Sequence, residues 1–156
     1  MTDHPPITPQ EVEAAQAAWG AGIVQIGAAD TWQAAHARAT QLVQELYIGD
    51  GSLLFCPTKA AQDQFRRTPA GAVSYMVGQD PAHSEDAGFA LEPWTAVRFE
   101  AIDTLIRGDL AISMGNYFFS RTDGTALRAE FSMVYTRGPS GTLRIQLHHS
   151  ALPFPG

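Results

Sequence analysis

The spacing of apolar residues changes part-way along the chain. Up to about residue 77 they recur every three or four positions, as they do on one face of a helix. From Trp94 onward apolar and polar residues alternate, as they do along a strand with one buried face. The pattern predicts helices first and strands afterwards, which is an α+β protein with its helices packed on one face of a bent antiparallel sheet.

Three helices are expected, near residues 9–26, 31–47 and 69–77. The first begins at the capping box Thr8-Pro9-Gln10-Glu11, with proline in the first helical position. The third follows Thr68-Pro69 and ends at Gly78. A short strand is expected over residues 52–56. The segment 79–88 is expected to be a solvated polar loop.

Four strands are expected near residues 94–104, 110–120, 126–137 and 142–149, and the glycine-containing turns between them are typical of hairpins. With no linker and no repeat, the chain is expected to form one domain over residues 1–156. Both faces of the strands carry apolar residues, for example Phe118 and Phe119. A second copy of the chain is therefore expected to cover the outer sheet face, which gives at least a homodimer.

The charge and the cysteine content exclude several kinds of partner and site. Sixteen acidic and ten basic residues give a net charge of −6, which argues against a nucleic-acid or anionic-membrane partner. Cys56 is the only cysteine, so neither an internal disulfide nor a cysteine-rich metal site can form. The first residues lack the basic and apolar regions of a secretion signal, which predicts a cytoplasmic protein.

The last expected strand ends in two adjacent histidines and a serine. Because strand side chains alternate, His148 is expected to share a face with Ser150, and His149 to lie on the other face with Ile145 and Leu147. Rings that point about 180° apart cannot readily bind one metal ion. The pattern favours histidine–hydroxyl acid–base chemistry, and the alternative is a strand end that meets a neighbouring subunit.

Six segments stand out by their order and spacing: Leu54-Phe55-Cys56-Pro57-Thr58-Lys59-Ala60, Gly71-Ala72-Val73-Ser74-Tyr75, Glu85-Asp86-Ala87-Gly88-Phe89-Ala90-Leu91, Pro93-Trp94, Met114-Gly115-Asn116-Tyr117-Phe118-Phe119 and Leu147-His148-His149-Ser150. Together they resemble the iota class of carbonic anhydrases, over roughly residues 8–153. That family is built on a domain similar to the calcium/calmodulin-dependent kinase II association domain. The resemblance implies the cone-shaped nuclear-transport-factor-2-like fold.

The resemblance also implies an active centre made of Thr58, Tyr75, His148, His149 and Ser150. Some family members are described as working without metal and others as manganese-dependent. For this chain the sequence favours a site without a cofactor over one with manganese or zinc.

The chain departs from the family pattern at two positions. Cys56 replaces a lysine or similar residue, and Ala151 replaces a second serine after His-His-Ser. If that second serine is the working hydroxyl of the family, its loss puts activity in doubt.

The implied reaction is the reversible hydration of carbon dioxide to bicarbonate. Zinc enzymes lower the pKa of water from about 15.7 to about 7, which is roughly 12 kcal/mol, whereas one charge-assisted hydrogen bond contributes about 1.5–3 kcal/mol. A water that loses its proton as it attacks is therefore expected, with His148 or His149 as general base and shuttle.

Hydroxyl and apolar side chains have separate expected roles in this reaction. Thr58, Tyr75 and a serine are expected to donate hydrogen bonds to the bicarbonate oxygens. Phe55, Phe65 and Met76 are the expected apolar wall for carbon dioxide.

A second class of function stays open at this point. The chain could be a non-catalytic ligand-binding or oligomerisation module of the kinase association-domain type. In the kinase domain an arginine stands where this chain has His149, so the histidine favours proton chemistry.

Overall fold

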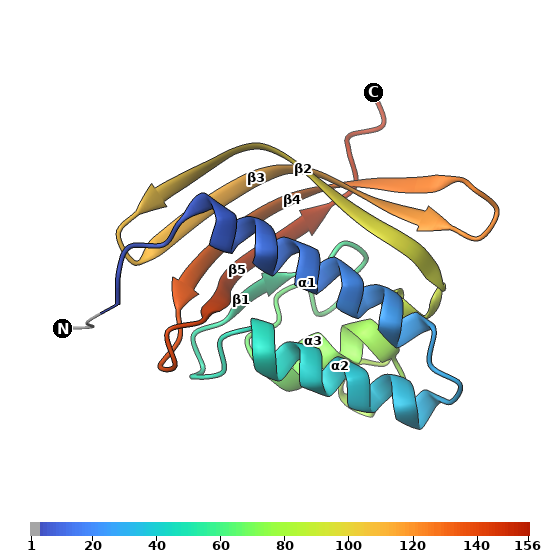
Figure 1. The fold of residues 1–156 in the computed structure, drawn as a ribbon. Coiled ribbons are helices and arrows are strands. Elements are labelled where there is room, and N and C mark those ends of the chain that lie inside the picture. The colour runs from blue at the N-terminus through green and yellow to red at the C-terminus, as the bar shows by residue number, and fades with distance from the viewer. Residues whose placement is uncertain (1–3) are drawn as a thin grey trace.

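A computed structural model describes residues 4–156. Three helices, α1 (Pro9–Gly27), α2 (Trp32–Leu46) and α3 (Pro69–Val77), lie on one face of a curved five-stranded sheet (Figure 1). The strands are β1 (Leu54–Cys56), β2 (Trp94–Arg107), β3 (Leu110–Arg121), β4 (Ala126–Arg137) and β5 (Leu143–Ala151). Short 3₁₀ helices η1 (Pro81–His83) and η2 (Phe89–Leu91) lead from α3 into β2. The α+β arrangement expected from the sequence is confirmed.

The helices begin where the capping residues predict. The Thr8 hydroxyl accepts from the Glu11 amide at 3.2 Å, and the Glu11 carboxylate accepts from the Thr8 amide at 3.2 Å, which completes the capping box. Thr31 and Thr68 cap α2 and α3 in the same way, each with one side-chain bond at 3.1 Å. Gly78 ends α3 with φ of 68°, a left-handed conformation that favours glycine.

The sheet has the order β1-β5-β4-β3-β2. The four long strands form the expected antiparallel meander. The sheet is mixed rather than wholly antiparallel, because β1 pairs with β5 in parallel and places Phe55 opposite His148. Hairpin turns fix the direction of the meander strands only. The long connection between β1 and β5 leaves their relative direction to tertiary packing.

The bend of the sheet comes from irregularities in the strand pairing. The register of β2 against β3 shifts between Ala101 and Asp103, which is a bulge of the kind that twists and bends a strand. Gly115 sits opposite this bulge, paired with Ala101, and a Cβ there would lie 2.3 Å from the Glu100 carbonyl oxygen. Only glycine therefore fits where β3 passes the bend.

A second bulge decides which residues of β5 face the core. Val134 pairs with Leu147 and Tyr135 pairs with Ile145, so Gln146 is the extra residue. Ile145 is consequently buried on the same side as His148, not on the side of His149 as strict alternation predicted. His148 and Ser150 do share the inner face as expected, and His149 is exposed on the outer face.

Candidate active site

A buried histidine lies at the centre of the inner sheet face. His148 is 2% exposed, and each of its ring nitrogens contacts a tyrosine hydroxyl. Nδ1 lies 2.9 Å from the hydroxyl of Tyr47, the residue that ends α2, and Nε2 lies 3.1 Å from the hydroxyl of Tyr117 on β3. The indole N–H of Trp19, on α1, donates to the Tyr47 hydroxyl at 3.0 Å. Two helices and two strands thus fix one imidazole.

A run of hydroxyl groups continues from His148 toward α3. The Tyr117 hydroxyl is hydrogen-bonded to Ser150 Oγ, and Ser150 Oγ lies 2.5 Å from Thr58 Oγ1. The hydroxyl of Tyr75 accepts from the Lys59 amide at 3.1 Å. Tyr75 therefore keeps its own hydrogen for another acceptor.

These groups line a small cavity of about 10 Å³, on the scale of one water molecule. Its polar lining consists of four hydroxyl side chains and one imidazole: Thr58, Tyr75, Tyr117, Ser150 and His148. Its apolar lining consists of Trp19, Ile23, Phe55, Met76 and Phe89. Phe55 stacks on the His148 ring with centroids 4.8 Å apart. The site joins hydrogen-bonding groups to an apolar wall.

Burial controls the ionisation of the site. Desolvation, with a smaller contribution from nearby His149, lowers the pKa of His148 to about 3. Desolvation also raises the pKa of Tyr75 to about 12 and raises the pKa of Tyr117 and Tyr47 above the usual range. Near pH 7 the site therefore holds a neutral imidazole and protonated phenols.

A second, wider pocket of about 150 Å³ adjoins the cavity. The two share Tyr75 and Phe89, whose rings stack at 5.5 Å. Lys59 and the carboxylates of Glu85, Asp86 and Glu92 also line this pocket. It is partly open to solvent, and the stacked rings line both it and the inner cavity.

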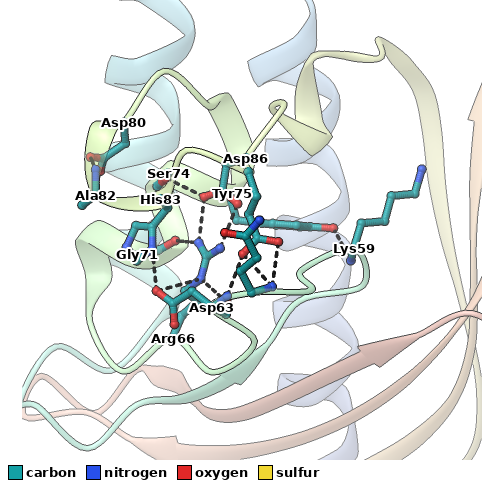
Figure 2. Close-up of polar contacts among 12 residues, drawn as sticks. Lys59, Asp63, Arg66, Gly71, Ser74, Tyr75, Asp80, Ala82, His83 and Asp86 are labelled. Carbon is teal, nitrogen blue, oxygen red and sulfur yellow. Dashed lines mark hydrogen bonds and ion pairs between the residues drawn. The ribbon is translucent and has the colours of Figure 1, made fainter.

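A buried ion pair supports the segment that carries Thr58 and α3 (Figure 2). Arg66 holds Asp86 through two bonds of 2.8 Å, and both side chains are almost fully buried. Arg66 also donates to the Gly71 carbonyl at 3.0 Å, and Ser74 donates to Asp86 at 2.6 Å. This network fixes the start and middle of α3, next to Tyr75.

Glu85 anchors the loop that follows Thr58. Its carboxylate accepts from the amides of Ala61, Gln62 and Asp63 at 2.6–3.2 Å, and these bonds lower the pKa of Glu85. The segment 79–88 was expected to be a solvated loop. Instead, its residue Asp86 is buried by the ion pair with Arg66, and Glu85 binds backbone amides.

The structure brings most of the expected site residues together, but not all. Thr58, Tyr75, His148 and Ser150 line the cavity, and Phe55 and Met76 form part of its apolar wall. Phe65 is 67% exposed and lines, with His149, an outer groove that shares only Phe55 and His148 with the cavity. His149 lies there because it is on the opposite face of β5 from His148. Phe65 lies there because the turn after β1 leads it away from the core.

Sequence reasoning missed three hydrogen-bonding residues around the cavity, and also Ile23 and Phe89 of its apolar wall. Tyr47 and Tyr117 bind the two nitrogens of His148, and Trp19 binds Tyr47. One signal was available for Tyr117, which lies in a segment that carries the family resemblance. A buried tyrosine hydroxyl also needs a hydrogen-bond partner, so a tyrosine at a core position points to a polar neighbour.

Metal-binding residues do not gather in the part of the chain that the structure describes. Within residues 4–156, no group of three or more His, Cys, Asp or Glu side chains is arranged to hold a metal ion. Across the same residues, no helix combines the length and the apolar character needed to cross a membrane.

Comparison with known proteins identifies the family. The family model described as metal-independent carbonic anhydrase matches residues 10–152. The chain belongs to the metal-independent carbonic anhydrase family. A metal-independent carbonic anhydrase of Nostoc sp. is 38% identical over 155 residues, which cover 95% of this chain and 75% of the relative. The expected family and the expected metal-free class are confirmed.

Solved structures agree with this family. The crystal structure of a cyanobacterial iota-carbonic anhydrase complexed with bicarbonate matches with a TM-score of 0.94 at 38% identity, over 97% of this chain and 95% of that one. A putative calcium/calmodulin-dependent kinase II association domain from Xanthomonas campestris matches with a TM-score of 0.62 at 18% identity, over 99% and 98%. At that identity the second match shows the fold alone. A nuclear transport factor 2-like superfamily protein from Salmonella enterica shares that fold, with a TM-score of 0.58 at 13% identity, over 94% of this chain and 92% of that one.

Proposed function

We propose that this metal-independent carbonic anhydrase performs the reversible hydration of carbon dioxide beside Thr58 and Tyr75, where the one-water cavity meets the wider pocket of about 150 Å³. The observation that carries the proposal is the convergence of four hydroxyl groups and a neutral imidazole on a cavity with an apolar wall. Carbon dioxide needs apolar surroundings, whereas bicarbonate needs hydrogen-bond donors. The cavity offers both.

In the hydration direction, a water oxygen bonds to the carbon of carbon dioxide while one O–H bond of that water breaks. Negative charge then grows on the oxygens of the former carbon dioxide. Thr58 and Tyr75 donate hydrogen bonds to these oxygens. Tyr75 suits this role because its raised pKa of about 12 keeps its hydrogen in place.

The released proton leaves through the wider pocket beyond Tyr75 and Phe89 to a base in the solvent. Sequence reasoning gave the role of base to His148 or His149. The pKa of His148, lowered to about 3, makes it a poor proton acceptor near pH 7, and His149 lies on the outer face. In this proposal His148 orients the hydroxyl groups instead.

Replacing Tyr75 by phenylalanine tests the assignment. The Tyr75→Phe variant removes one donor to the developing charge, so turnover should fall by about 10²–10³-fold. Stopped-flow measurement of carbon dioxide hydration gives the rate. The matched control is Tyr135→Phe, which removes a buried hydroxyl that contacts the sulfur of Met133 instead. Equal rates in wild type and Tyr75→Phe would contradict the proposed role.

We also propose that the chain forms a homodimer through the outer face of its sheet. The strand register places five apolar side chains in one continuous row across all the strands: Leu54, Leu147, Val134, Ile112 and Leu105. Met114 in the neighbouring row is 56% exposed. An apolar band of this extent is typical of a surface that another subunit covers. Carbon dioxide and bicarbonate are the proposed small-molecule partners.

Other expectations from the sequence stay predictions. These are the cytoplasmic location and the lack of nucleic-acid and membrane partners.

A further inference from the structure

The hydroxyl chain in the active site has a direction, because each hydroxyl has one hydrogen to give. Tyr117 contacts both His148 Nε2 and Ser150 Oγ, and its single hydrogen can go to only one of them. The choice depends on whether Nε2 carries a proton. The direction of the Tyr117 bond in turn fixes the direction of the bonds from Ser150 and Thr58.

The two possible directions leave different groups for the substrate. If Nε2 is protonated, it donates to Tyr117, Tyr117 donates to Ser150, and Ser150 donates to Thr58. Thr58 then has its hydrogen for the Tyr75 hydroxyl or for a ligand in the cavity. If Nε2 is unprotonated, the direction of each of these hydrogen bonds reverses, and Thr58 donates its hydrogen to Ser150. Thr58 then offers the cavity only a lone pair.

The surroundings of Nδ1 decide between these states. The Trp19 indole nitrogen is a donor only, so the Tyr47 oxygen must accept from it. The single hydrogen of Tyr47 is then free for Nδ1, 2.9 Å away. A protonated Nδ1 would leave that hydrogen with no other acceptor within the described residues 4–156, and Tyr47 is only 2% exposed. An unpaired buried hydroxyl hydrogen costs about 1–3 kcal/mol.

We propose that Tyr47 and Trp19 are positioning residues, which set the direction of the hydroxyl chain by holding the proton of His148 on Nε2. Neither residue needs to touch the substrate. Through His148, Tyr117 and Ser150 they make Thr58 a donor, which is what the oxygens of bicarbonate require. The link to catalysis rests on the proposed function, whereas the state of His148 does not.

The first test is the tautomer of His148 in the wild-type protein. Nitrogen-15 NMR of the histidine side chains at pH 7 distinguishes a protonated Nε2 from a protonated Nδ1. The His148 signals are assigned by their loss in His148→Gln. We expect a protonated Nε2 and a bare Nδ1. A protonated Nδ1, or a ring protonated on both nitrogens, would overturn the proposal whatever the activity of the protein.

The second test is the variant Tyr47→Phe, with Tyr135→Phe as control. Without the Tyr47 hydroxyl, Nδ1 loses its donor, so the second tautomer should appear in the NMR spectrum. The hydration rate should fall about 10-fold, less than the 10²–10³-fold that is typical of deleting a donor that touches the substrate. Tyr135→Phe should keep the single tautomer and the wild-type rate.

These outcomes distinguish a failure of the positioning role from a failure of the proposed function. If Tyr47→Phe keeps both the single tautomer and the wild-type rate, Tyr47 is not a positioning residue. If the tautomer shifts in that variant but wild type has no hydration activity, the proposed function fails and the tautomer assignment stands. If Tyr47→Phe does not fold, the nitrogen-15 spectrum of wild type decides alone, and a protonated Nδ1 there overturns the proposal.

Discussion

His148 stays neutral because the groups that contact its ring are uncharged. Its two nitrogens meet uncharged hydroxyls, and its ring stacks on Phe55, so no carboxylate compensates for the loss of water. A histidine buried in this way keeps a neutral ring well below its usual pKa of about 6.5. It can hold hydroxyls in place over the whole physiological pH range without changing charge.

The lowered pKa of His148 predicts how stability depends on pH. The unfolded chain protonates this histidine below about pH 6.5, whereas the folded chain stays neutral down to about pH 3. The unfolded state therefore binds more protons in that window. The folded state should lose roughly 1.4 kcal/mol for each pH unit as the pH falls from about 6 to about 4.

Urea unfolding at pH 7 and pH 5 measures this loss. The His148→Gln variant is the control, since glutamine does not titrate, and its free energy of unfolding should change less between the two pH values. Carboxylates with lowered pKa, such as Glu11 and Glu85, act mainly below this range. Equal pH dependence in wild type and variant would contradict a neutral His148.

Of the residues around the cavity, sequence reasoning named those with recognisable chemistry and did not name those that we propose as positioning residues. Thr58, Tyr75, His148 and Ser150 were named because hydroxyl and imidazole groups stood in segments that resemble a family. Tyr47 and Trp19 were not named, because on a helix face they match ordinary core residues. Their role depends on a contact across about a hundred residues, such as that between Tyr47 and His148, which no local pattern encodes.

At the scale of elements, the active site depends on how α3 and the turn before it are fixed. Arg66 joins the turn after β1 to Asp86 beyond α3, and Ser74 on α3 binds the same carboxylate. Arg66 also pairs with the backbone of Phe55 through bonds of 3.1 and 2.7 Å. The elements that carry Thr58 and Tyr75 are thereby tied to one buried ion pair.

Breaking this pair should destabilise the fold. Asp86→Asn leaves the Arg66 guanidinium buried without its counter-charge, which should cost about 3–5 kcal/mol of unfolding free energy. Urea unfolding measures the loss. The control, Glu100→Gln, breaks an exposed pair with Arg98, whose side chains are both 62% exposed, and should cost about 0–1 kcal/mol. Similar losses in the two variants would show that the buried pair has no special role.

The elements themselves were largely predictable, and the exceptions have physical causes. Capping threonines, prolines and turn glycines located the three helices and the four meander strands to within a few residues. The bulge at Gln146 was not predictable, because its glutamine resembles any polar strand residue. Its side chain is held by the Ser52 carbonyl at 2.7 Å, a contact that exists only after β1 and β5 have paired. The parallel pairing of β1 with β5 could not be predicted from the sequence for the same reason.

At the scale of the whole molecule, the two faces of the sheet carry different kinds of residue. The inner face carries Tyr117, His148 and Ser150 of the proposed site, and the outer face carries the apolar row from Leu54 to Leu105. His149 lies in the row beside it, opposite Cys56 on β1. In the proposed dimer His149 is therefore close to the partner subunit, which matches the structural alternative that the sequence left open for the histidine pair.

A charge placed in the apolar row should separate the subunits. Ile112→Glu buries a carboxylate at the centre of the proposed interface, so light scattering should give a mass near the 16.8 kDa of one chain, and wild type about twice that mass. Ala17→Glu, on an exposed position of α1, should keep the wild-type mass. A wild-type protein that is monomeric at micromolar concentration would contradict the proposed dimer.

The central claim is that hydroxyl groups and a neutral histidine hydrate carbon dioxide without a bound metal. Stopped-flow hydration by chelator-treated protein, with residual metal measured in the same sample, tests it most directly. The account predicts a rate above the uncatalysed background that is unchanged by metal removal and does not rise when manganese or zinc is added back. A rate that falls to background on chelation and returns with either metal would contradict it, as would a protein that shows no hydration under any of these conditions.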